Sequence, residues 1–385
     1  MRRTGSVVAL TLLTVAAWVG FASLAGPRAW ADIYSDCSSK DFERAVRGCT
    51  SIIERGSQES AENRARAYYN RGTDYTRKGQ LDWAIADFDK AIELDPDWAE
   101  PYSDRGLAYA GKGQLDRAAA DLNKAIDLKP DYAVAYNNRG TVREMKGQID
   151  LALADYSRAL ELDPGLAQSY VNRGAVYAKS NQLDRANADF NKAIELDPNI
   201  AKAYHNRGGI YLKRGQLDRA IPDYDRAIEL DPNMAQAYVF RGSIRARMGR
   251  NDLALADFSK AIEIDPSDAE SHHFRGKLYV RKRQFDRAIA EFNKAIELNP
   301  SLARAYGNRG AIYARIGQID RAKADFDKAI ELDSNAANVF SNRSIVYARN
   351  GQIDRAISDI RKAISIDPGN QRYQALLKQL EAARN

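Results

Sequence analysis

Small apolar side chains recur along this chain of 385 residues at a fixed interval, which sets the expected secondary structure. One set of alanines repeats every 34 residues from Ala84 to Ala356, and a second set does so from Ala91 to Ala363. The two sets are seven residues apart, about two helical turns, so they lie on one face of one helix. Small side chains on that face allow a partner helix to approach closely.

Turn residues divide the same interval into helix, short turn and helix. In the fifth unit, the pattern predicts helices over residues 201–214 and 217–230, with positive φ at Gly215 between them. The turn residue is glycine in seven units, and Asn181 also tolerates this conformation, whereas Arg283 predicts a distorted or extended turn. Ser334 occupies the one proline position that lacks proline. The prolines that end the second helices are Pro96, Pro130, Pro164, Pro198, Pro232, Pro266, Pro300 and Pro368.

Nine units of this length, over residues 65–370, predict an array of stacked supersecondary units rather than one globular core. We therefore expect function to lie in a surface. The sequence has no nucleophile elbow, phosphate-binding glycine loop or His-Glu-x-x-His motif. His272 and His273 are neighbours and cannot share a metal on one helix face, and His205 lies two units away. We expect no enzyme, no cofactor and no metal site.

The units resemble the tetratricopeptide repeat family when each is numbered from its first residue, with Ala65 at position 1. Position 4 is aromatic in eight units, position 8 is Gly or Ser, positions 20 and 27 are Ala, and position 24 is mostly aromatic. Position 11 is Tyr in seven units, and Arg143 and Arg245 depart from it. The resemblance implies an all-α fold, a right-handed α-solenoid or superhelix of nine helix-turn-helix repeats whose first helices line a concave groove, with capping helices at both ends.

Residues 1–31 have the pattern of a secretory signal peptide, with Arg2 and Arg3, an apolar run over residues 7–25 and a small-residue end at Ala31. We expect a periplasmic or secreted protein beginning near Asp32. The apolar run is long enough to span a bilayer, so a membrane anchor at residues 7–25 is the alternative.

The segments that flank the repeats predict caps. Residues 32–64 hold the only cysteines, Cys37 and Cys49, which we expect to form a disulfide in an exported protein, with two buried thiols as the alternative. Ala45, Cys49 and Ile52 match positions 20, 24 and 27, which predicts a lone second helix over the open end of the array. Residues 371–385 predict a capping helix with an apolar stripe that includes Leu380.

Position 7 is arginine and position 23 is acidic in all nine repeats. Because the two helices of a repeat are antiparallel, this pattern predicts a ladder of partly buried ion pairs, either within a repeat or between neighbours. We interpret it as architecture and not as a ligand site.

The charge balance excludes one class of partner. Removal of residues 1–31 takes away three arginines and no acid, so the net charge falls from +6 to +3. That balance is unsuited to nucleic-acid binding by bulk electrostatics. We expect a protein or peptide partner, no small-molecule substrate, and membrane contact only if the amino-terminal segment is retained.

The family resemblance assigns the groove to positions 2, 5, 6, 9, 12 and 13. Amides at position 6 can hydrogen-bond an extended peptide backbone, although they can equally serve packing between repeats. Basic residues at position 13 favour an acidic ligand, with a solvated face as the alternative. Position 6 carries Asn70, Asp104, Asn138, Asn172, Asn206, Phe240, Phe274, Asn308 and Asn342, and position 13 carries Arg77, Gly111, Met145, Lys179, Lys213, Arg247, Arg281, Arg315 and Arg349.

Phe240 and Phe274 interrupt the amides in consecutive repeats. Phe240 has no expected packing role, because Tyr238 fills the aromatic core position of its repeat. Phe274 has an alternative role in the core, since His272 replaces tyrosine at position 4. Together the rings predict an apolar anchor within a basic rim.

Two functions follow. The first is a non-catalytic scaffold that binds an extended, acidic peptide or partner protein in its concave groove. The alternative is a structural component of a cell-envelope assembly, such as polysaccharide or pilus export, that uses its convex face and ends. An apolar site within a polar groove favours the first, and an apolar convex patch beside a uniformly charged groove favours the second.

Overall fold

The computed structural model describes residues 27–384, with side chains from residue 32 onward, so the predicted apolar segment over residues 7–25 lies outside the described residues. Residues 27–384 are all-helical, with 21 α-helices, one short 3-10 turn and no strand. The described residues divide into two compact units, with the boundary between Asp155 and Tyr156, and the two units are treated separately below. None of the described helices is both long enough and apolar enough to cross a membrane.

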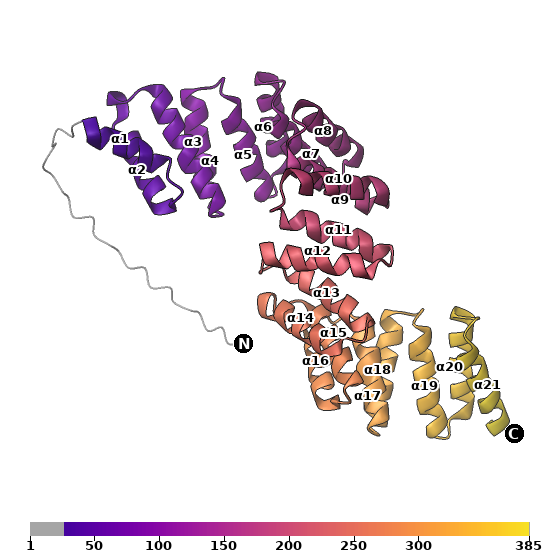
Figure 1. Ribbon diagram of the computed structural model, residues 1–385. Helices are drawn as coiled ribbons and strands as arrows, with labels where there is room; N and C mark the ends of the chain where they lie inside the picture. Colours follow the sequence, from indigo (N-terminus) through magenta and orange to yellow (C-terminus); the bar gives the residue numbers. More distant parts are fainter. Residues whose placement is uncertain (1–26, 385) are drawn as a thin grey trace, which may run out of the picture. The chain divides into compact units, whose positions relative to one another are not determined.

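In each unit, consecutive helices form antiparallel pairs that stack side by side (Figure 1). The amino-terminal unit contains α1 (Pro27–Cys37), α2 (Phe42–Glu54), the 3-10 turn η1 (Gly56–Gln58), α3 (Ala61–Arg77), α4 (Leu81–Leu94), α5 (Ala99–Gly111), α6 (Leu115–Leu128), α7 (Ala133–Met145) and the start of α8 (Ile149–Leu162). The carboxy-terminal unit contains the rest of α8, then α9 (Ala167–Lys179), α10 (Leu183–Leu196), α11 (Ala201–Lys213), α12 (Leu217–Leu230), α13 (Ala235–Arg247), α14 (Asn251–Ile264), α15 (Ala269–Arg281), α16 (Phe285–Leu298), α17 (Ala303–Arg315), α18 (Ile319–Leu332), α19 (Ala337–Arg349), α20 (Ile353–Ile366) and α21 (Gln371–Arg384).

Helices α3 to α20 form the nine predicted repeats, and the expected α-solenoid fold is confirmed. The turn between α11 and α12 has Gly215 at φ +71, as predicted. The predicted distortion at Arg283 was wrong, because Arg283 adopts φ +57 and the Gln284 amide still donates to the Tyr279 carbonyl at 2.9 Å. Packing of the two helices therefore imposes the turn, at a conformational cost of roughly 1–2 kcal/mol.

The glycine at position 8 allows the two helices of a repeat to touch. A Cβ atom on Gly72 would lie 2.8 Å from the Phe88 ring, closer than real contacts allow. The last repeat has Ser344 at this position and the smaller Ile360 opposite. There the serine hydroxyl donates to the Ala356 carbonyl at 2.7 Å. The size of one side chain is thus matched to the size of the other.

The arginine at position 7 donates hydrogen bonds to two other side chains, as repeat 5 illustrates. Arg207 Nε and Nη2 donate to both carboxylate oxygens of Asp223 at 2.8 and 2.7 Å. Its remaining Nη1 donates to Asn191, at position 25 of the preceding repeat, at 2.8 Å. The predicted ladder is confirmed, and each position 7 arginine pairs with the position 23 acid of its own repeat: Arg71–Asp87, Arg105–Asp121, Arg139–Asp155, Arg173–Asp189, Arg207–Asp223, Arg241–Asp257, Arg275–Glu291, Arg309–Asp325 and Arg343–Asp359.

Where arginine replaces tyrosine at position 11, the residue at position 19 also changes. Arg143 and Arg245 each add a second guanidinium to the position 23 carboxylate of their repeat, at 2.7 and 2.8 Å. Position 19 of those two repeats is leucine, whereas six repeats with Tyr at position 11 have an arginine there. Those six arginines lie 4.1 to 5.9 Å from the tyrosine rings, a cation–π distance. A leucine next to Arg143 or Arg245 avoids placing two cations together.

The amino-terminal cap is a helix pair, so the prediction of a lone second helix was wrong. Helix α1 packs on α2, and α2 packs on α3. The Cys37–Cys49 disulfide joins α1 to α2. A Cβ on Gly48 would lie 2.4 Å from the backbone nitrogen of Cys37, which shows how closely the helices approach. Thr50 of the cap accepts a hydrogen bond from Arg71 Nη1 at 2.8 Å. In the later repeats the position 25 side chain of the preceding repeat accepts the corresponding bond.

Helix α21 covers the other end of the array. Leu380 is buried, and Leu376 and Leu377 pack against the same cluster on α20. Arg361, at position 25 of the last repeat, pairs with Glu381 of α21 at 2.7 Å.

A double-mutant cycle in repeat 5 tests the ladder. Arg207→Ala leaves the buried Asp223 carboxylate without its partner, and we expect a loss of about 3 kcal/mol in the free energy of unfolding in urea. Asp223→Ala should have a loss of similar size. The double variant should be clearly less destabilised than the sum of the two, and strict additivity would show that the residues are not energetically coupled.

Candidate functional site

The groove face consists of positions 2, 5, 6, 9, 12 and 13 of the first helices. In the carboxy-terminal unit, all six basic residues at position 13 are exposed. Arg281 donates to the Ala246 carbonyl at 2.8 Å, and Arg315 lies 5.0 Å from the Phe285 ring. Within residues 32–384, no carboxylate forms an ion pair with Lys213, Arg247 or Arg349, whose charges face solvent.

The balance of groove-face charges differs between the two units. In the carboxy-terminal unit nine cations accompany one carboxylate, Glu270, which pairs with Arg304. In the amino-terminal unit, Arg66 and Arg77 each pair with a carboxylate of their own helix. That unit also has Glu100, Asp104 and Glu144 on the groove face. Only the groove face of repeats 4–9 is therefore strongly basic.

Several position 6 side chains bond to position 5 of a neighbouring repeat. Asn138, only 6% exposed, donates to the Ser103 hydroxyl at 3.1 Å, and its oxygen accepts from Asn137 at 3.2 Å. Asp104 accepts from the Tyr69 hydroxyl at 2.9 Å. Burial raises the pKa of Asp104. At these positions the polar side chains serve packing between repeats, which was the alternative interpretation of the amide ladder.

The other amides differ in their partners. Asn308 bonds to His273 at 2.9 Å across a repeat boundary, and Asn172 accepts from Gln168 of its own helix at 2.9 Å. The Asn70 amide faces Cys37 Sγ at 3.9 Å. Asn206 and Asn342 are half-buried, and Asn342 lines a shallow cavity with Arg315 and Arg349.

Phe240 is part of the packing, so the prediction that it has no packing role was wrong. Its ring stacks on Tyr224 with centroids 5.8 Å apart and an interplanar angle of 13°. It also contacts His205 of the preceding repeat at 5.6 Å. Position 6 lies at the boundary between two repeats. In other repeats an asparagine at this position forms hydrogen bonds there, whereas the Phe240 ring packs against its neighbours.

Phe274 occupies the equivalent place one repeat later. Its ring stacks on Phe258 with centroids 5.5 Å apart. It does not substitute for the tyrosine that repeat 7 lacks, because His272 is itself buried and its Nδ1 bonds to Glu291 at 2.8 Å. The two phenylalanines therefore pack at different boundaries, and each remains half-buried.

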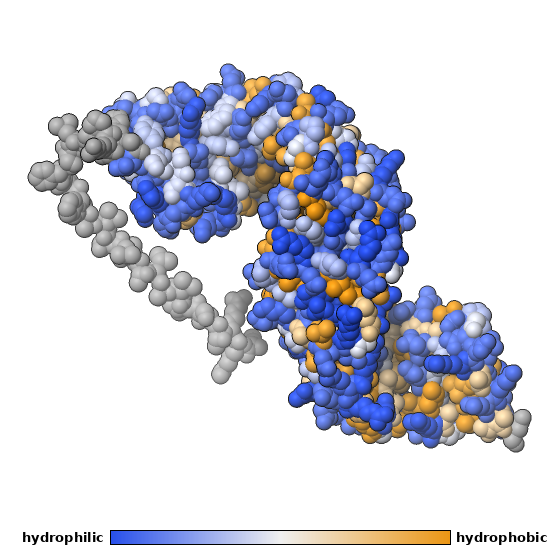
Figure 2. All heavy atoms as spheres, in the orientation of Figure 1, coloured by the Kyte–Doolittle hydropathy of each residue, from blue (hydrophilic) through white to orange (hydrophobic). Residues whose placement is uncertain are grey.

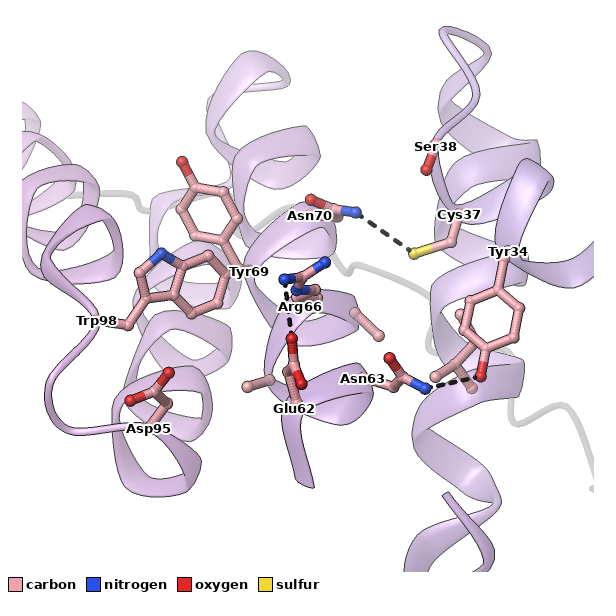
Figure 3. A pocket seen from close by; sticks show the side chains of 13 residues that line it. Tyr34, Cys37, Ser38, Glu62, Asn63, Arg66, Tyr69, Asn70, Asp95 and Trp98 are labelled. Atoms are coloured by element: carbon pink, nitrogen blue, oxygen red, sulfur yellow. Dashed lines mark hydrogen bonds and ion pairs between the residues drawn. The ribbon is translucent and has the colours of Figure 1, made fainter. Parts of the chain in front are cut away.

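A cavity of about 560 Å³ lies at the amino-terminal end of the groove face (Figure 3). Figure 3 shows Arg66 and Asn70 on α3 between Trp98 and Tyr69 on one side and Tyr34 on the other. The indole and the Tyr69 ring are 4.7 Å apart. Arg66 is neutralised by Glu62 at 2.8 Å. This site suits an apolar or aromatic side chain rather than an anion.

A second cavity, of about 410 Å³, lies in repeats 7 to 9. Phe274, Lys277 and Arg304 line it together with His273 and Asn308. Its cations place it in the basic part of the groove face, and its phenylalanine ring supplies apolar surface. Within residues 32–384, no cluster of His, Cys, Asp or Glu is arranged to hold a metal.

The repeat models identify the family. Tetratricopeptide repeat models match residues 65–97, 133–166, 167–200, 201–234, 303–336 and 337–370. A further TPR repeat model matches residues 111–147, 242–282 and 276–317. The chain therefore belongs to the tetratricopeptide repeat family, whose members are typically non-catalytic protein-interaction scaffolds. Comparison with curated protein sequences found no match.

Cut9-Hcn1 and PilF are two of the solved structures that share the fold of this chain. The APC/C hetero-tetramer Cut9-Hcn1 is 18% identical and aligns over 92% of this chain and 86% of that chain, with a TM-score of 0.56. PilF of Pseudomonas aeruginosa is 17% identical over 55% of this chain and 97% of that chain, with a TM-score of 0.51. YrrB, described as a TPR protein with an unusual peptide-binding site, is 28% identical over 49% of this chain and 97% of that chain, with a TM-score of 0.41.

Buried His273 generates a prediction about pH. Burial, with a smaller contribution from Lys277, lowers the pKa of His273 from 6.5 to about 4 in the folded chain. Below pH 6.5 the unfolded chain binds a proton that the folded chain does not, so stability is lost as pH falls from 6.5 towards 4. We expect this residue to account for a loss on the order of 3 kcal/mol in the unfolding free energy.

The measurement compares the wild type with His273→Asn, the residue that repeat 3 has at the same position, by urea unfolding across this pH range. The variant removes the imidazole of residue 273 and keeps every acidic side chain of the wild type. The wild type should lose its advantage over the variant as pH falls. A constant difference between the two proteins would contradict the prediction.

Proposed function

We propose that this chain is a non-catalytic scaffold whose groove face in repeats 4–9 binds an extended, acidic segment of a partner protein. The observation that carries the proposal is the set of exposed cations at position 13, joined on the same face by Lys202 and Lys277 and opposed by a single paired carboxylate. Converging positive charge raises the local potential and favours an acidic ligand. Bonds between neighbouring repeats hold several of the amides, so charge and apolar contacts would contribute more to binding than an amide ladder.

The distribution of apolar surface favours this function over an envelope-assembly component that uses its second helices. Trp83, Leu151 and Leu253 are exposed on second helices, but they lie in repeats 1, 3 and 6 and are separated by repeats with arginine at the same position. Figure 2 shows a largely hydrophilic surface with hydrophobic atoms in small areas on the visible face. The cavity around Phe274, by contrast, places an aromatic ring and Val339 among polar side chains, which gives the groove face a local apolar contact.

We further propose that the chain is exported and begins near Asp32 once residues 1–31 are removed. The disulfide supports this proposal, because disulfides persist in oxidising compartments. If the apolar run is instead retained, the scaffold would be displayed from a membrane.

Binding of a short poly-glutamate peptide tests the basic groove. Neutralising Lys213, Arg247 and Arg349 with glutamine should weaken binding about tenfold at low salt, since three exposed contacts of about 0.5 kcal/mol each are lost. Lys192, Lys260 and Lys328 on second helices form the matched control, because their neutralisation changes the net charge equally. Equal weakening by both sets in a fluorescence-anisotropy titration would rule out a localised groove site.

Mass spectrometry of protein isolated from its native host tests export. We expect a chain that begins near Asp32 and a mass two hydrogens below that of the dithiol form, and alkylation should modify neither cysteine before reduction. The Cys37–Cys49 loop should stabilise the cap by about 3 kcal/mol on the chain-entropy model. Free thiols would refute oxidation, and an intact amino terminus would place the protein at the membrane.

A further inference from the structure

The cavity in repeats 7 to 9 differs from the rest of the groove face in its floor. Position 5 has a side chain in eight repeats, but in repeat 8 it is Gly307. A Cβ atom there would lie 3.0 Å from Val339 Cγ2. Val339 therefore packs directly on the Gly307 backbone, and these two residues form the floor of a hollow, with Ala303 and Ala336 beside them.

The wall of the cavity combines an aromatic ring with two cations, and its lining also includes one carboxylate, that of Asp333. Phe274 is held in place by its stack on Phe258, with an interplanar angle of 16°. Lys277 Nζ lies 5.8 Å and Arg304 Cζ 6.0 Å from the centre of the Phe274 ring, so both cations border the same ring. Lys277 and Arg304 are both exposed. Of these two, only Arg304 pairs with a carboxylate of the described residues, Glu270.

A partly buried hydrogen bond fixes the polar edge of the cavity. Asn308 Nδ2 lies 2.9 Å from His273 Nε2, and an amide nitrogen can only donate, so Nε2 accepts and the proton of the neutral imidazole is on Nδ1. His273 is 2% exposed, and its Nδ1 has no hydrogen-bond partner, with Glu270 Oε2 4.0 Å away. The Asn308 amide group is thereby oriented, which leaves its carbonyl oxygen to accept from a ligand N–H.

We propose that this cavity binds an aliphatic side chain whose sequence neighbour is a glutamate or aspartate. The aliphatic group fills the hollow above Gly307 and Val339, against the Phe274 ring. The neighbouring carboxylate pairs with Lys277, and Asn308 accepts a backbone N–H. The proposal rests on the proposed function, and it names the motif within the acidic segment that determines affinity: an acidic and aliphatic pair rather than acidic residues alone.

Substitutions borrowed from other repeats provide the test with little disturbance to folding. Phe274→Asn introduces the residue that six repeats have at position 6, and Lys277→Ser introduces the residue of repeat 6 at position 9. Phe240→Asn is the matched control, because Phe240 makes the same kind of stack one boundary earlier and does not line the cavity. Both asparagine variants should lose similar stability in thermal unfolding.

The probes are three flexible Gly/Ser peptides that carry Glu-Leu-Glu, Glu-Ser-Glu or Gln-Leu-Gln at the centre. The wild type should bind the Glu-Leu-Glu peptide most tightly, and Phe274→Asn should weaken that binding about thirtyfold, in line with a central aromatic contact. Phe240→Asn should change it by less than about threefold. Lys277→Ser should reduce the preference for Glu-Leu-Glu over Gln-Leu-Gln.

The outcomes separate this inference from the proposed function. Equal binding of the Glu-Leu-Glu and Glu-Ser-Glu peptides, with no effect of Phe274→Asn, would overturn the cavity site while acidic binding stands. Equal losses from Phe274→Asn and Phe240→Asn would also overturn it, since they would reflect packing alone. Binding of neither acidic peptide to the wild type would overturn both proposals.

Discussion

The hydrogen-bonded arginine at position 7 is the constraint on which the rest of the structure depends. Its guanidinium satisfies a buried acid in its own repeat and also donates to position 25 of the preceding element, which is the cap before repeat 1. A guanidinium has donors in a fixed fork, so one side chain sets both the spacing within a repeat and the register between neighbours. The flanking aromatic residues at positions 4 and 11 lie 5.6 and 5.9 Å from Arg207 in repeat 5 and shield the charge from water.

Because the hydrogen bonds of the position 7 arginine lie away from the groove face, the residues of the groove face are free to vary. Positions 2, 5, 6, 9 and 13 change from repeat to repeat, whereas positions 7, 8, 20, 23 and 27 remain nearly constant. Local chemistry follows from that freedom: an aromatic cavity beside Trp98 in one unit, and exposed cations with a hollow at Gly307 in the other. A uniform scaffold thus presents distinct sites along its length.

The sequence predicted the fold well, because a repeated pattern reports the same packing nine times. It also predicted the pairing of position 7 with position 23, since both residue types are fixed and the helices are antiparallel. It failed where a residue occurs once. Helix α1 has no repeat pattern to reveal its pairing with α2, and the burial of Phe240 depends on His205 and Tyr224 in the preceding repeat. The hollow at Gly307 likewise depends on what its neighbours leave unfilled, which periodicity does not report.

The outward hydrogen bond of the position 7 arginine has a consequence for how such a chain changes length. Its acceptor is a carboxylate, an amide or a hydroxyl in different repeats, for example Asp89, Asn123 and Ser157. The junction between modules therefore demands only an oxygen atom, not a particular partner. After insertion, deletion or duplication of a repeat, the arginine at the new boundary would still find an oxygen acceptor at position 25 of the repeat before it. Duplication within the gene can therefore extend the array without compensating changes on either side of the new boundary.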